Sequence, residues 1–235
     1  MKILVTGGTG FCGSHIAKNL ADLGHDVCVT GTQTEHDLNL RILNHHLTGI
    51  NWSLLKNIDV VFHQAANNDT LFEDKDEMFL ANVHAPIELF KRLYKNGCKK
   101  FIYASSTAVY GNSPCPYKEE VGINPLNVYA ESKAEFDKFA MDFSKNKNIS
   151  VIGLRYCNVY GPGECHKKRR SSKIGQMIKN VFNQEPITLF RSGEQKRDWI
   201  YIEDVVKANI AGMDYNRSDI FNCATGVSTS FNQLV

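Results

Sequence analysis

The sequence predicts an α/β protein built on a doubly wound parallel sheet. Two observations carry this prediction: a glycine-rich turn directly follows the first apolar run, and strand and helix patterns then alternate along the chain. The 235 residues are 43% hydrophobic and 22% charged, which is enough apolar material for a sizeable core. Because the net charge is only +2, nothing global indicates nucleic acid or a membrane surface as a partner.

The glycine-rich turn places glycine at positions 7, 10 and 13. One glycine allows the tight turn, one lets backbone amides approach a pyrophosphate, and one lets the next helix pack closely on the strand. The N-terminus of that helix presents unpaired amides and a positive dipole end, which bind phosphate without a basic side chain. The amphipathic run that follows ends at Gly24, a natural helix stop. The turn therefore predicts a dinucleotide site.

The second strand is expected over residues 25–31. A dinucleotide site usually carries Asp or Glu at the end of this strand to hold the adenosine ribose. Here Thr30 has that place, followed by Gly31 and Thr32, and no Arg or Lys follows at once to receive a 2′-phosphate. The sequence leaves the choice between NAD and NADP open.

Later elements continue the alternation. Strands are expected over residues 57–66, 100–106, 151–156, 187–190 and 220–224. Helices are expected over residues 79–94, 127–144, 171–184 and 202–213, with another opening at 230. The polar segment after the second strand is expected to carry His45 and His46 on a solvated helix. Pro86 interrupts a helical pattern, so that helix either kinks there or begins near Ala85.

The cysteines and the apolar runs of the sequence indicate the cellular compartment expected for the chain. The seven cysteines show no CxxC spacing and are expected to be reduced thiols. Cys165 lies beside His166, but without further ligands the pair is not expected to bind a metal. The sequence shows no signal-peptide core and no apolar run long enough to cross a bilayer, so a cytoplasmic location is expected.

A candidate acid–base pair lies in the helix expected at 127–144. Tyr129 and Lys133 are four residues apart, so their side chains share one face. An ammonium group and a nicotinamide cation both favour phenolate, so the pKa of Tyr129 is expected to fall from about 10 toward working pH. Such a phenol suits proton transfer coupled to hydride transfer. The alternative, a chance pair of surface residues, is disfavoured by the glycine turn and by the hydroxyl-ended strand at 100–106.

These motifs resemble the extended short-chain dehydrogenase/reductase family, specifically its nucleotide-sugar epimerases and dehydratases. The resemblance runs almost end to end. The matching segments are residues 6–13, 37–38, 63–66, 82, 105–111, 129–133, 155–162 and 197–205. The resemblance implies a Rossmann-type doubly wound parallel sheet with a small C-terminal substrate-binding lobe. It also implies NAD or NADP as cofactor and a nucleotide-diphosphate sugar as substrate.

The resemblance assigns roles to particular residues. Ser106 takes the place of the catalytic hydroxyl, Tyr129 that of the proton-transfer residue, and Lys133 that of the lysine at the nicotinamide ribose. The implied cofactor-binding residues are Gly7, Gly10, Phe11, Cys12, Gly13, Thr30, Asp37, Leu38, Ala65, Ala66, Asn82, Tyr129, Lys133 and Tyr156. The implied substrate-binding residues are Ser106, Thr107, Asn158, Lys167 and Arg197, with Asn158 and Arg197 at the diphosphate.

The residues after Ser106 bear on the reaction. In the resembling family, 4,6-dehydratases carry Asp-Glu, or at least Glu, there, because eliminating water needs an acid and a base at the far carbons of the sugar. Here the positions hold Thr107 and Ala108, so dehydration and the related decarboxylation are not expected. A 4-epimerase needs only Ser106, Tyr129 and Lys133, since hydride leaves the sugar for the nicotinamide and returns to the other face.

Segments 125–129, 161–167 and 189–198 resemble ADP-heptose 6-epimerases most. The chain also shares motifs with UDP-hexose 4-epimerases. In the 6-epimerases a second base follows the Gly-Pro turn, and the resemblance puts it at Lys167, for reprotonation from the opposite face. The alternative is that Lys167 belongs to a solvated or diphosphate-binding basic run, 167–170.

The sequence as a whole predicts an NAD(P)-dependent nucleotide-sugar epimerase, for cell-surface polysaccharide. The alternatives are an NAD(P)H-dependent nucleotide keto-sugar reductase and a cofactor-binding protein without turnover. Residues 1–165 are expected to form the dinucleotide-binding domain with the active site. Residues 166–235 are expected to form a partial substrate-binding lobe, interleaved with the last sheet strands and truncated. The resemblance also implies a homodimer, with the helices at 79–94 and 127–144 in a four-helix bundle.

Overall fold

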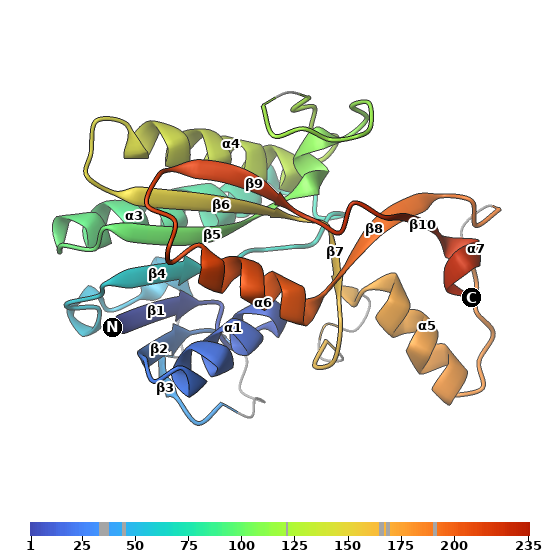
Figure 1. Cartoon of the computed structure of the whole chain (residues 1–235), viewed down its shortest axis with the longest axis horizontal. Coiled ribbons are helices and arrows are strands. Elements are labelled where there is room, and N and C mark those ends of the chain that lie inside the picture. Colours follow the sequence, from blue (N-terminus) through green and yellow to red (C-terminus); the bar gives the residue numbers. More distant parts are fainter. Residues whose placement is uncertain (33–37, 44–45, 121, 165–166, 168–169, 190–191) are drawn as a thin grey trace.

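A computed structural model describes residues 1–235 except 33–37, 44–45, 121, 165–166, 168–169 and 190–191 (Figure 1). The strands are β1 (Lys2–Thr6), β2 (Asp26–Thr30), β3 (Arg41–Leu43), β4 (Val60–His63), β5 (Lys100–Ser106), β6 (Ser150–Tyr156), β7 (Asn158–Tyr160), β8 (Lys196–Tyr201), β9 (Asp219–Cys223) and β10 (Ser228–Ser230). The helices are α1 (Phe11–Asp22), α2 (Lys75–Phe79), α3 (Ala85–Lys95), α4 (Val128–Ser144), α5 (Lys173–Phe182), α6 (Ile202–Ala211) and α7 (Phe231–Leu234). The 3-10 turns are η1 (Leu47–Gly49), η2 (Trp52–Leu54) and η4 (Thr107–Tyr110), and η3 (Leu80–His84) is a π-helical segment.

The main sheet confirms the predicted fold class. Its strand order is β3-β2-β1-β4-β5-β6-β9, and every neighbouring pair is parallel. The order reverses between β1 and β4, so the connections leave these two strands in opposite directions. In open parallel sheets the crevice at such a switch point, at the carboxyl ends of the strands, is where ligands bind.

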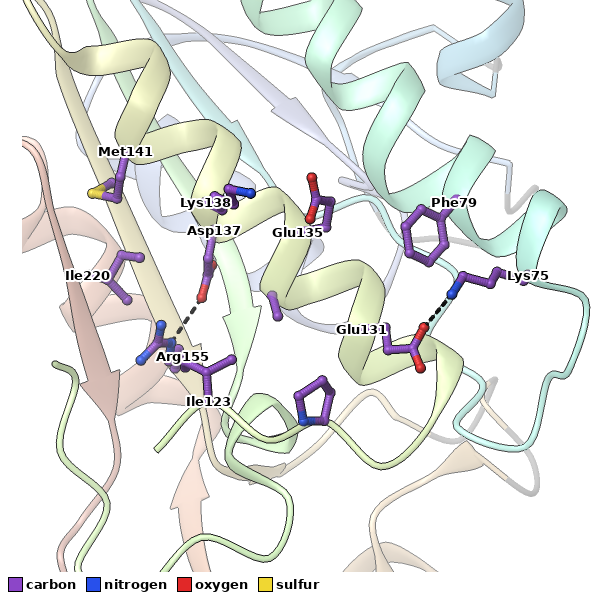
Figure 2. Close-up of a pocket in the computed structure, with 12 residues that line it drawn as sticks. Lys75, Phe79, Ile123, Glu131, Glu135, Asp137, Lys138, Met141, Arg155 and Ile220 are labelled. Atoms are coloured by element: carbon purple, nitrogen blue, oxygen red, sulfur yellow. Dashed lines mark hydrogen bonds and ion pairs between the residues drawn. The ribbon is translucent and has the colours of Figure 1, made fainter. Parts of the chain in front are cut away.

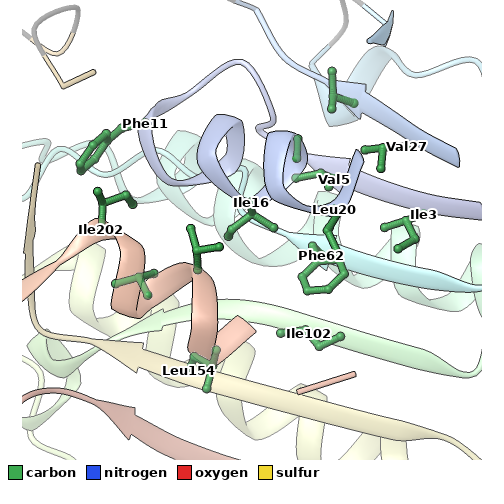
Figure 3. Close-up of a cluster of buried hydrophobic side chains, with 14 of the residues drawn as sticks. Ile3, Val5, Phe11, Ile16, Leu20, Val27, Phe62, Ile102, Leu154 and Ile202 are labelled. Carbon is green, nitrogen blue, oxygen red and sulfur yellow. The ribbon is translucent and has the colours of Figure 1, made fainter. Parts of the chain in front are cut away.

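Two apolar layers cover the sheet. On one face, α1 and α6 pack over the strands, with Ile16 and Leu20 from α1 and Val205 from α6 fully buried (Figure 3). On the other face, α3 and α4 contribute an aromatic cluster in which the Phe90 and Phe136 rings meet edge to face at 5.2 Å. Because both faces are covered, the middle residues of the central strands are apolar, while polar residues such as Thr6 and His63 lie at the strand ends.

The helical pattern around Pro86 combines features of both predicted alternatives. Regular α-helix begins at Ala85, with Pro86 in its first turn, where the missing amide costs no hydrogen bond. Helical residues nevertheless extend back to Lys75, where Asp74 caps the helix by accepting a hydrogen bond from the backbone amide of Glu77. The π-helical segment η3 joins the two parts. Its wider turn removes the clash that Pro86 would make with a carbonyl one α-turn earlier.

The segment after β2 was predicted to be a solvated helix, and for its described part this prediction is wrong. It contains β3, which pairs in parallel with β2 from Cys28↔Arg41 to Thr30↔Leu43. His46 is exposed and precedes a 3-10 turn, and His45 lies outside the described residues. An unpaired edge of β2 would leave backbone groups unsatisfied, so pairing outweighs the polar composition of the segment.

A second sheet, with order β10-β8-β7, lies apart from the main one together with α5 and α7 (Figure 1). The strand predicted near 187–190 is wrong for residues 187–189, and Phe190 is outside the described part. The strand forms instead at β8, where the sequence analysis predicted no strand. After β8 the chain returns to the main sheet as α6 and β9, so the two parts interleave. The predicted domain boundary at residue 165 stays a prediction.

Candidate active site

The glycine turn is built without room for side chains. Gly7 has a φ of 66°, and a Cβ there would lie 2.7 Å from the backbone nitrogen of Ala65. A Cβ on Gly13 would lie 2.2 Å from the carbonyl oxygen of Gly7. The first turn of α1 therefore sits directly against the end of β1, and β4 approaches from the other side. This close packing aims the free amides of α1 at the crevice.

A cavity of about 580 Å³ occupies this crevice. The predicted cofactor residues that line it are Gly7, Gly10, Phe11, Cys12, Gly13, Thr30, Ala65 and Ala66. Leu38 is buried in the adjoining apolar layer, and Asp37 lies outside the described residues. Lys167 and Arg170 also line the cavity, on the side of the C-terminal lobe.

The far end of the cavity holds hydroxyl groups where many dinucleotide sites have an acid. Thr30, Thr32 and Thr48 line it there, and Glu77, from α2, is the one acidic residue among the described residues of its wall. Amide donors, small residues and hydroxyls suit a dinucleotide, with the pyrophosphate at the start of α1 and the adenosine ribose at Thr30. The residues present thus fit NAD.

Ser106, Tyr129 and Lys133 come together near this cavity, where Cys12 of its wall acts electrostatically on Tyr129, although none of the three lines the cavity itself. Ser106 ends β5, and its hydroxyl accepts a hydrogen bond from the amide of Ala108 at 3.2 Å. Tyr129 and Lys133 lie on successive turns of α4, and the Lys133 Nζ lies 6.0 Å from the centre of the Tyr129 ring. Lys133 donates to the carbonyl oxygen of Ala104 at 2.9 Å. The roles of the three residues stay predictions.

Burial dominates the ionisation of this group. It raises the pKa of Tyr129, and a hydrogen bond with Ser106 acts in the opposite direction. Burial also lowers the pKa of Lys133 to about 8, against the attraction of Asp137, which raises it. The residues of the chain therefore raise the pKa of Tyr129, where the sequence analysis expected it to fall. A bound nicotinamide cation would supply a charge that lowers it.

The segment His63–Ala66 is pinned to β1. The Nδ1 of His63 and the Oγ1 of Thr6 are 2.7 Å apart, and the same Oγ1 accepts from the amide of Ala65 at 3.3 Å. Burial, with a smaller contribution from Lys133, lowers the pKa of His63 to about 3, so the ring is neutral at pH 7. The neutral His63 ring, through its hydrogen bond with Thr6, helps to hold the small residues of this segment against the cavity.

Asn82 lies behind the cavity wall and does not line it. Its side chain accepts from the amide of Asn67 at 2.8 Å and donates to the carbonyl of Asn67 at 2.9 Å. It also donates to the hydroxyl of Ser132 at 3.0 Å. Asn82 thus ties a cavity loop to α4, one position from Lys133. Any contact of Asn82 with the cofactor itself stays a prediction.

Tyr156 belongs to a closed polar triangle that the sequence analysis missed. Its hydroxyl donates to Gln64 Oε1 at 2.9 Å and accepts from Asn209 Nδ2 at 2.7 Å. Gln64 Nε2 completes the triangle by donating to Asn209 Oδ1 at 3.2 Å. Asn209 is fully buried on α6. A single asparagine on the apolar face of that helix was the available signal, but its partners lie far away in the sequence.

Lys167 is brought to the glycine turn by two anchors. His15 on α1 donates to the carbonyl of Pro162 at 2.9 Å, which holds the Gly-Pro turn against that helix. Glu164, 4% exposed, accepts at 2.6 Å from the amide of Ser172 and so begins α5. Between these anchors the Lys167 Nζ lies 5.2 Å from the centre of the Phe11 ring. Lys168 and Arg169 of the predicted basic run lie outside the described residues.

The remaining predicted substrate residues lie toward the second sheet. Thr107 donates to the carbonyl of Tyr156 at 3.1 Å, and Asn158 donates to the carbonyl of Asp198 at 3.0 Å. Arg197 on β8 is exposed and donates only to the carbonyl of Lys196 among its described contacts. Arg197 does not line the 580 Å³ cavity. Its predicted role at the phosphates stays a prediction.

The described residues also bear on membrane crossing, metal binding and the state of the cysteines. Over the described residues, no helix has both the length and the apolar character needed to cross a membrane. Within the same part of the chain, no three His, Cys, Asp or Glu side chains are placed to hold a metal ion. The six described cysteines are all free thiols.

The chain belongs to the NAD dependent epimerase/dehydratase family, whose sequence profile matches residues 3–224. It is 36% identical to an ADP-L-glycero-D-manno-heptose-6-epimerase of Brachyspira hyodysenteriae, over 99% of this chain and 78% of that protein. The crystal structure of the Helicobacter pylori ADP-L-glycero-D-manno-heptose-6-epimerase matches with a TM-score of 0.93 at 31% identity, over 100% of this chain and 80% of that one. A UDP-N-acetylglucosamine 4-epimerase from Methanobrevibacter ruminantium, solved with UDP-N-acetylmuramic acid, also matches with a TM-score of 0.93, at 32% identity over 99% and 79% of the two chains. These findings confirm the predicted family and NAD as its cofactor.

Proposed function

We propose that this protein is an NAD-dependent nucleotide-sugar epimerase and that its substrate is an ADP-heptose. The observation that carries the proposal is the assembly of Ser106, Tyr129 and Lys133 near the glycine-turn cavity. The neutral residues Thr107 and Ala108 stand where a dehydratase would need carboxylates. The choice of sugar is supported by the likeness to two heptose epimerases, and by Lys167 at the rim of the cavity.

Bound NAD would accept a hydride from the sugar carbon and return it. Tyr129 takes the proton of the hydroxyl on that carbon as the C–H bond breaks, and Ser106 donates a hydrogen bond to the same oxygen. Lys133, held by the Ala104 carbonyl, supplies a positive charge that favours the phenolate of Tyr129. Once the carbonyl compound has presented its other face, a side chain of the site returns a proton to its oxygen. Because epimerisation involves no net oxidation, turnover would need no added cofactor.

In this scheme Lys167 would be a second proton donor, and its location in the cavity wall supports that role. An epimerisation that delivers hydride to the opposite face also needs a proton delivered to oxygen in its new position. Lys167 lines the cavity and lies over Phe11, next to the glycine turn. Binding of a phosphate oxygen is the other role that an ammonium at this place could have.

The decisive experiment combines cofactor analysis with product analysis. Nucleotide released from the denatured protein is identified by mass spectrometry, and purified protein is incubated with each ADP-heptose epimer and followed by NMR. We expect tightly held NAD and interconversion of the two epimers without added cofactor. If the protein instead consumed added NADH in proportion to product, it would be a reductase and not an epimerase. Bound NAD without conversion would favour the non-catalytic reading.

Three finer properties belong to the same proposal. The protein would be a homodimer in which α3 and α4 of two copies pack together, would act in the cytoplasm, and would supply precursors of a cell-surface polysaccharide. Support for the dimer comes from the family resemblance and from the location of these helices on one side of the sheet (Figure 1). Sedimentation at equilibrium measures the first property: twice the mass of one chain supports it, and a single-chain mass contradicts it.

A further inference from the structure

A buried carboxylate lies in line with the catalytic pair on α4. Tyr129, Lys133 and Asp137 are spaced four residues apart and therefore lie on one face of the helix. Lys133 is 5% exposed and Asp137 is 3% exposed, so neither charge is compensated by water. The mechanism described above gives Asp137 no part. A buried ionised carboxylate is costly, so its presence needs a reason.

Asp137 is held as an ion from two strands. Arg155 on β6 donates from Nε to Oδ2 at 2.9 Å, and Tyr103 on β5 donates from its hydroxyl to Oδ1 at 3.0 Å. Figure 2 shows Arg155 pointing at Asp137, beside a cavity of about 630 Å³ on the outer side of α4. Burial raises the pKa of Asp137, and the charge of Arg155 together with these hydrogen bonds opposes that rise.

Arg155 is itself fixed in position. Its NH1 donates to the Tyr110 hydroxyl at 2.8 Å and to the carbonyl of Glu119 at 3.1 Å. The guanidinium is 4% exposed, and its side chain has no described acidic partner other than Asp137. The carboxylate therefore pairs with one buried cation, Arg155, and lies one helical turn from a second, Lys133.

The surroundings of Lys133 show what the carboxylate does. The titratable groups that face Lys133 are Tyr129 and Asp137 on α4 and His63 on β4, and the Ala104 carbonyl of β5 accepts a hydrogen bond from its Nζ. His63 is neutral, so Asp137 is the anion of this set. Burial lowers the pKa of Lys133 even with Asp137 in place. Without that negative charge, nothing in the set would oppose the loss of the lysine's proton.

We propose that Asp137, anchored by Arg155 and Tyr103, is a positioning residue that keeps Lys133 an ammonium ion beside Tyr129. Only the role of that ammonium ion during turnover depends on the proposed epimerase function. The charge state of Lys133 itself can be measured without any substrate. Loss of turnover and loss of this electrostatic support are therefore separate observations.

The test is an NMR titration of the NAD-loaded protein carrying ¹³C-labelled lysine, in which the Cε resonance of Lys133 is followed over a range of pH. The shift of this resonance on loss of the proton needs no access by a reagent, so its midpoint reports ionisation of the buried amine. In Asp137→Asn we expect the midpoint of Lys133 to move to lower pH by about 1–3 units. Asp137→Glu, which keeps the charge, should restore the midpoint toward the wild-type value. Glu135→Gln, an exposed neighbour on the same helix, is the matched control and should leave it unchanged.

If Asp137→Asn does not fold, the double variant Asp137→Asn with Arg155→Met takes its place. It removes both members of the buried pair and so leaves no unpaired ion. The midpoint of Lys133 should still move to lower pH, because Asp137 is the charged neighbour that raises its pKa. An unmoved midpoint in a folded variant overturns the proposal. A shifted midpoint in a protein that converts no nucleotide sugar would uphold it while the proposed function fails.

Discussion

Lys133 donates a hydrogen bond of 2.9 Å to the carbonyl oxygen of Ala104, two residues before Ser106 on the same strand. The strand that ends at Ser106, the predicted catalytic hydroxyl, therefore also holds Lys133, the predicted partner of Tyr129. Neither residue can shift along the sheet axis without the other. The distance between the hydroxyl and the ammonium is thus set by rigid elements of the fold, which favours a preorganised site.

Replacing Lys167 separates its two candidate roles. If Lys167 donates a proton, Lys167→Met should lower kcat by about 10²–10⁴-fold and change KM little. If it binds phosphate, KM should rise and kcat should persist. Steady-state kinetics with the ADP-heptose make the distinction. Lys173→Met, an exposed lysine at the start of α5, is the matched control, and an equal loss there would argue against a specific role.

Adding a methyl group at Gly13 should remove the bound cofactor. The new Cβ would lie 2.2 Å from the Gly7 carbonyl oxygen, so α1 must move away from the turn whose amides face the pyrophosphate. We expect Gly13→Ala to be purified without NAD and to lose about 1–3 kcal/mol of unfolding free energy. Gly49→Ala, where a Cβ meets nothing within 4 Å, should keep both. Released nucleotide and urea denaturation measure the two effects.

The buried neutral His63 should make the protein sensitive to acid. Its folded pKa of about 3 lies below the unfolded value near 6.5, so the unfolded state binds more protons between these values. Its contribution to stability is therefore full above pH 6.5 and is lost as the pH falls toward 3.

Urea denaturation at pH 7 and pH 4.5 tests this contribution. The decrease in unfolding free energy from pH 7 to pH 4.5 should be about 2 kcal/mol smaller in His63→Asn than in the wild type. His84→Asn, at an exposed position on η3, is the control. Equal pH dependence in His63→Asn and the wild type would contradict the prediction.

Breaking the triangle around Tyr156 should destabilise the contact between the cavity wall and α6. Asn209→Leu removes the partner of both Gln64 and the Tyr156 hydroxyl and leaves buried polar atoms unpaired. We expect a loss of about 1–3 kcal/mol in unfolding free energy. A cycle with Tyr156→Phe should show coupling between the two residues, since they share one network. Strictly additive losses would show that the triangle does not act as a unit.

Much of the site could be predicted because its determinants are local. The glycine spacing encodes the tight turn, and Thr30, at the carboxyl end of β2, lines the cavity because the carboxyl ends of parallel strands meet at one edge. The catalytic role of Ser106 follows from the family resemblance and stays a prediction. The four-residue spacing of Tyr129 and Lys133 is likewise a property of any helix. The segment with β3 and the strand β8 were not predicted, because their polar sequences form strands only through pairing with a neighbour.

The sequence by itself therefore determined the parallel sheet, the glycine turn and the shared helical face of Tyr129 and Lys133, since each depends on contacts within a few residues or on simple periodicity. Only the tertiary structure decided what surrounds that pair. Asp137 meets Arg155 across 18 positions, and Gln64 meets Tyr156 across 92. Such partners are chosen by how α4, α6 and the strands pack together, and that packing sets the burial and the charge that act on Lys133.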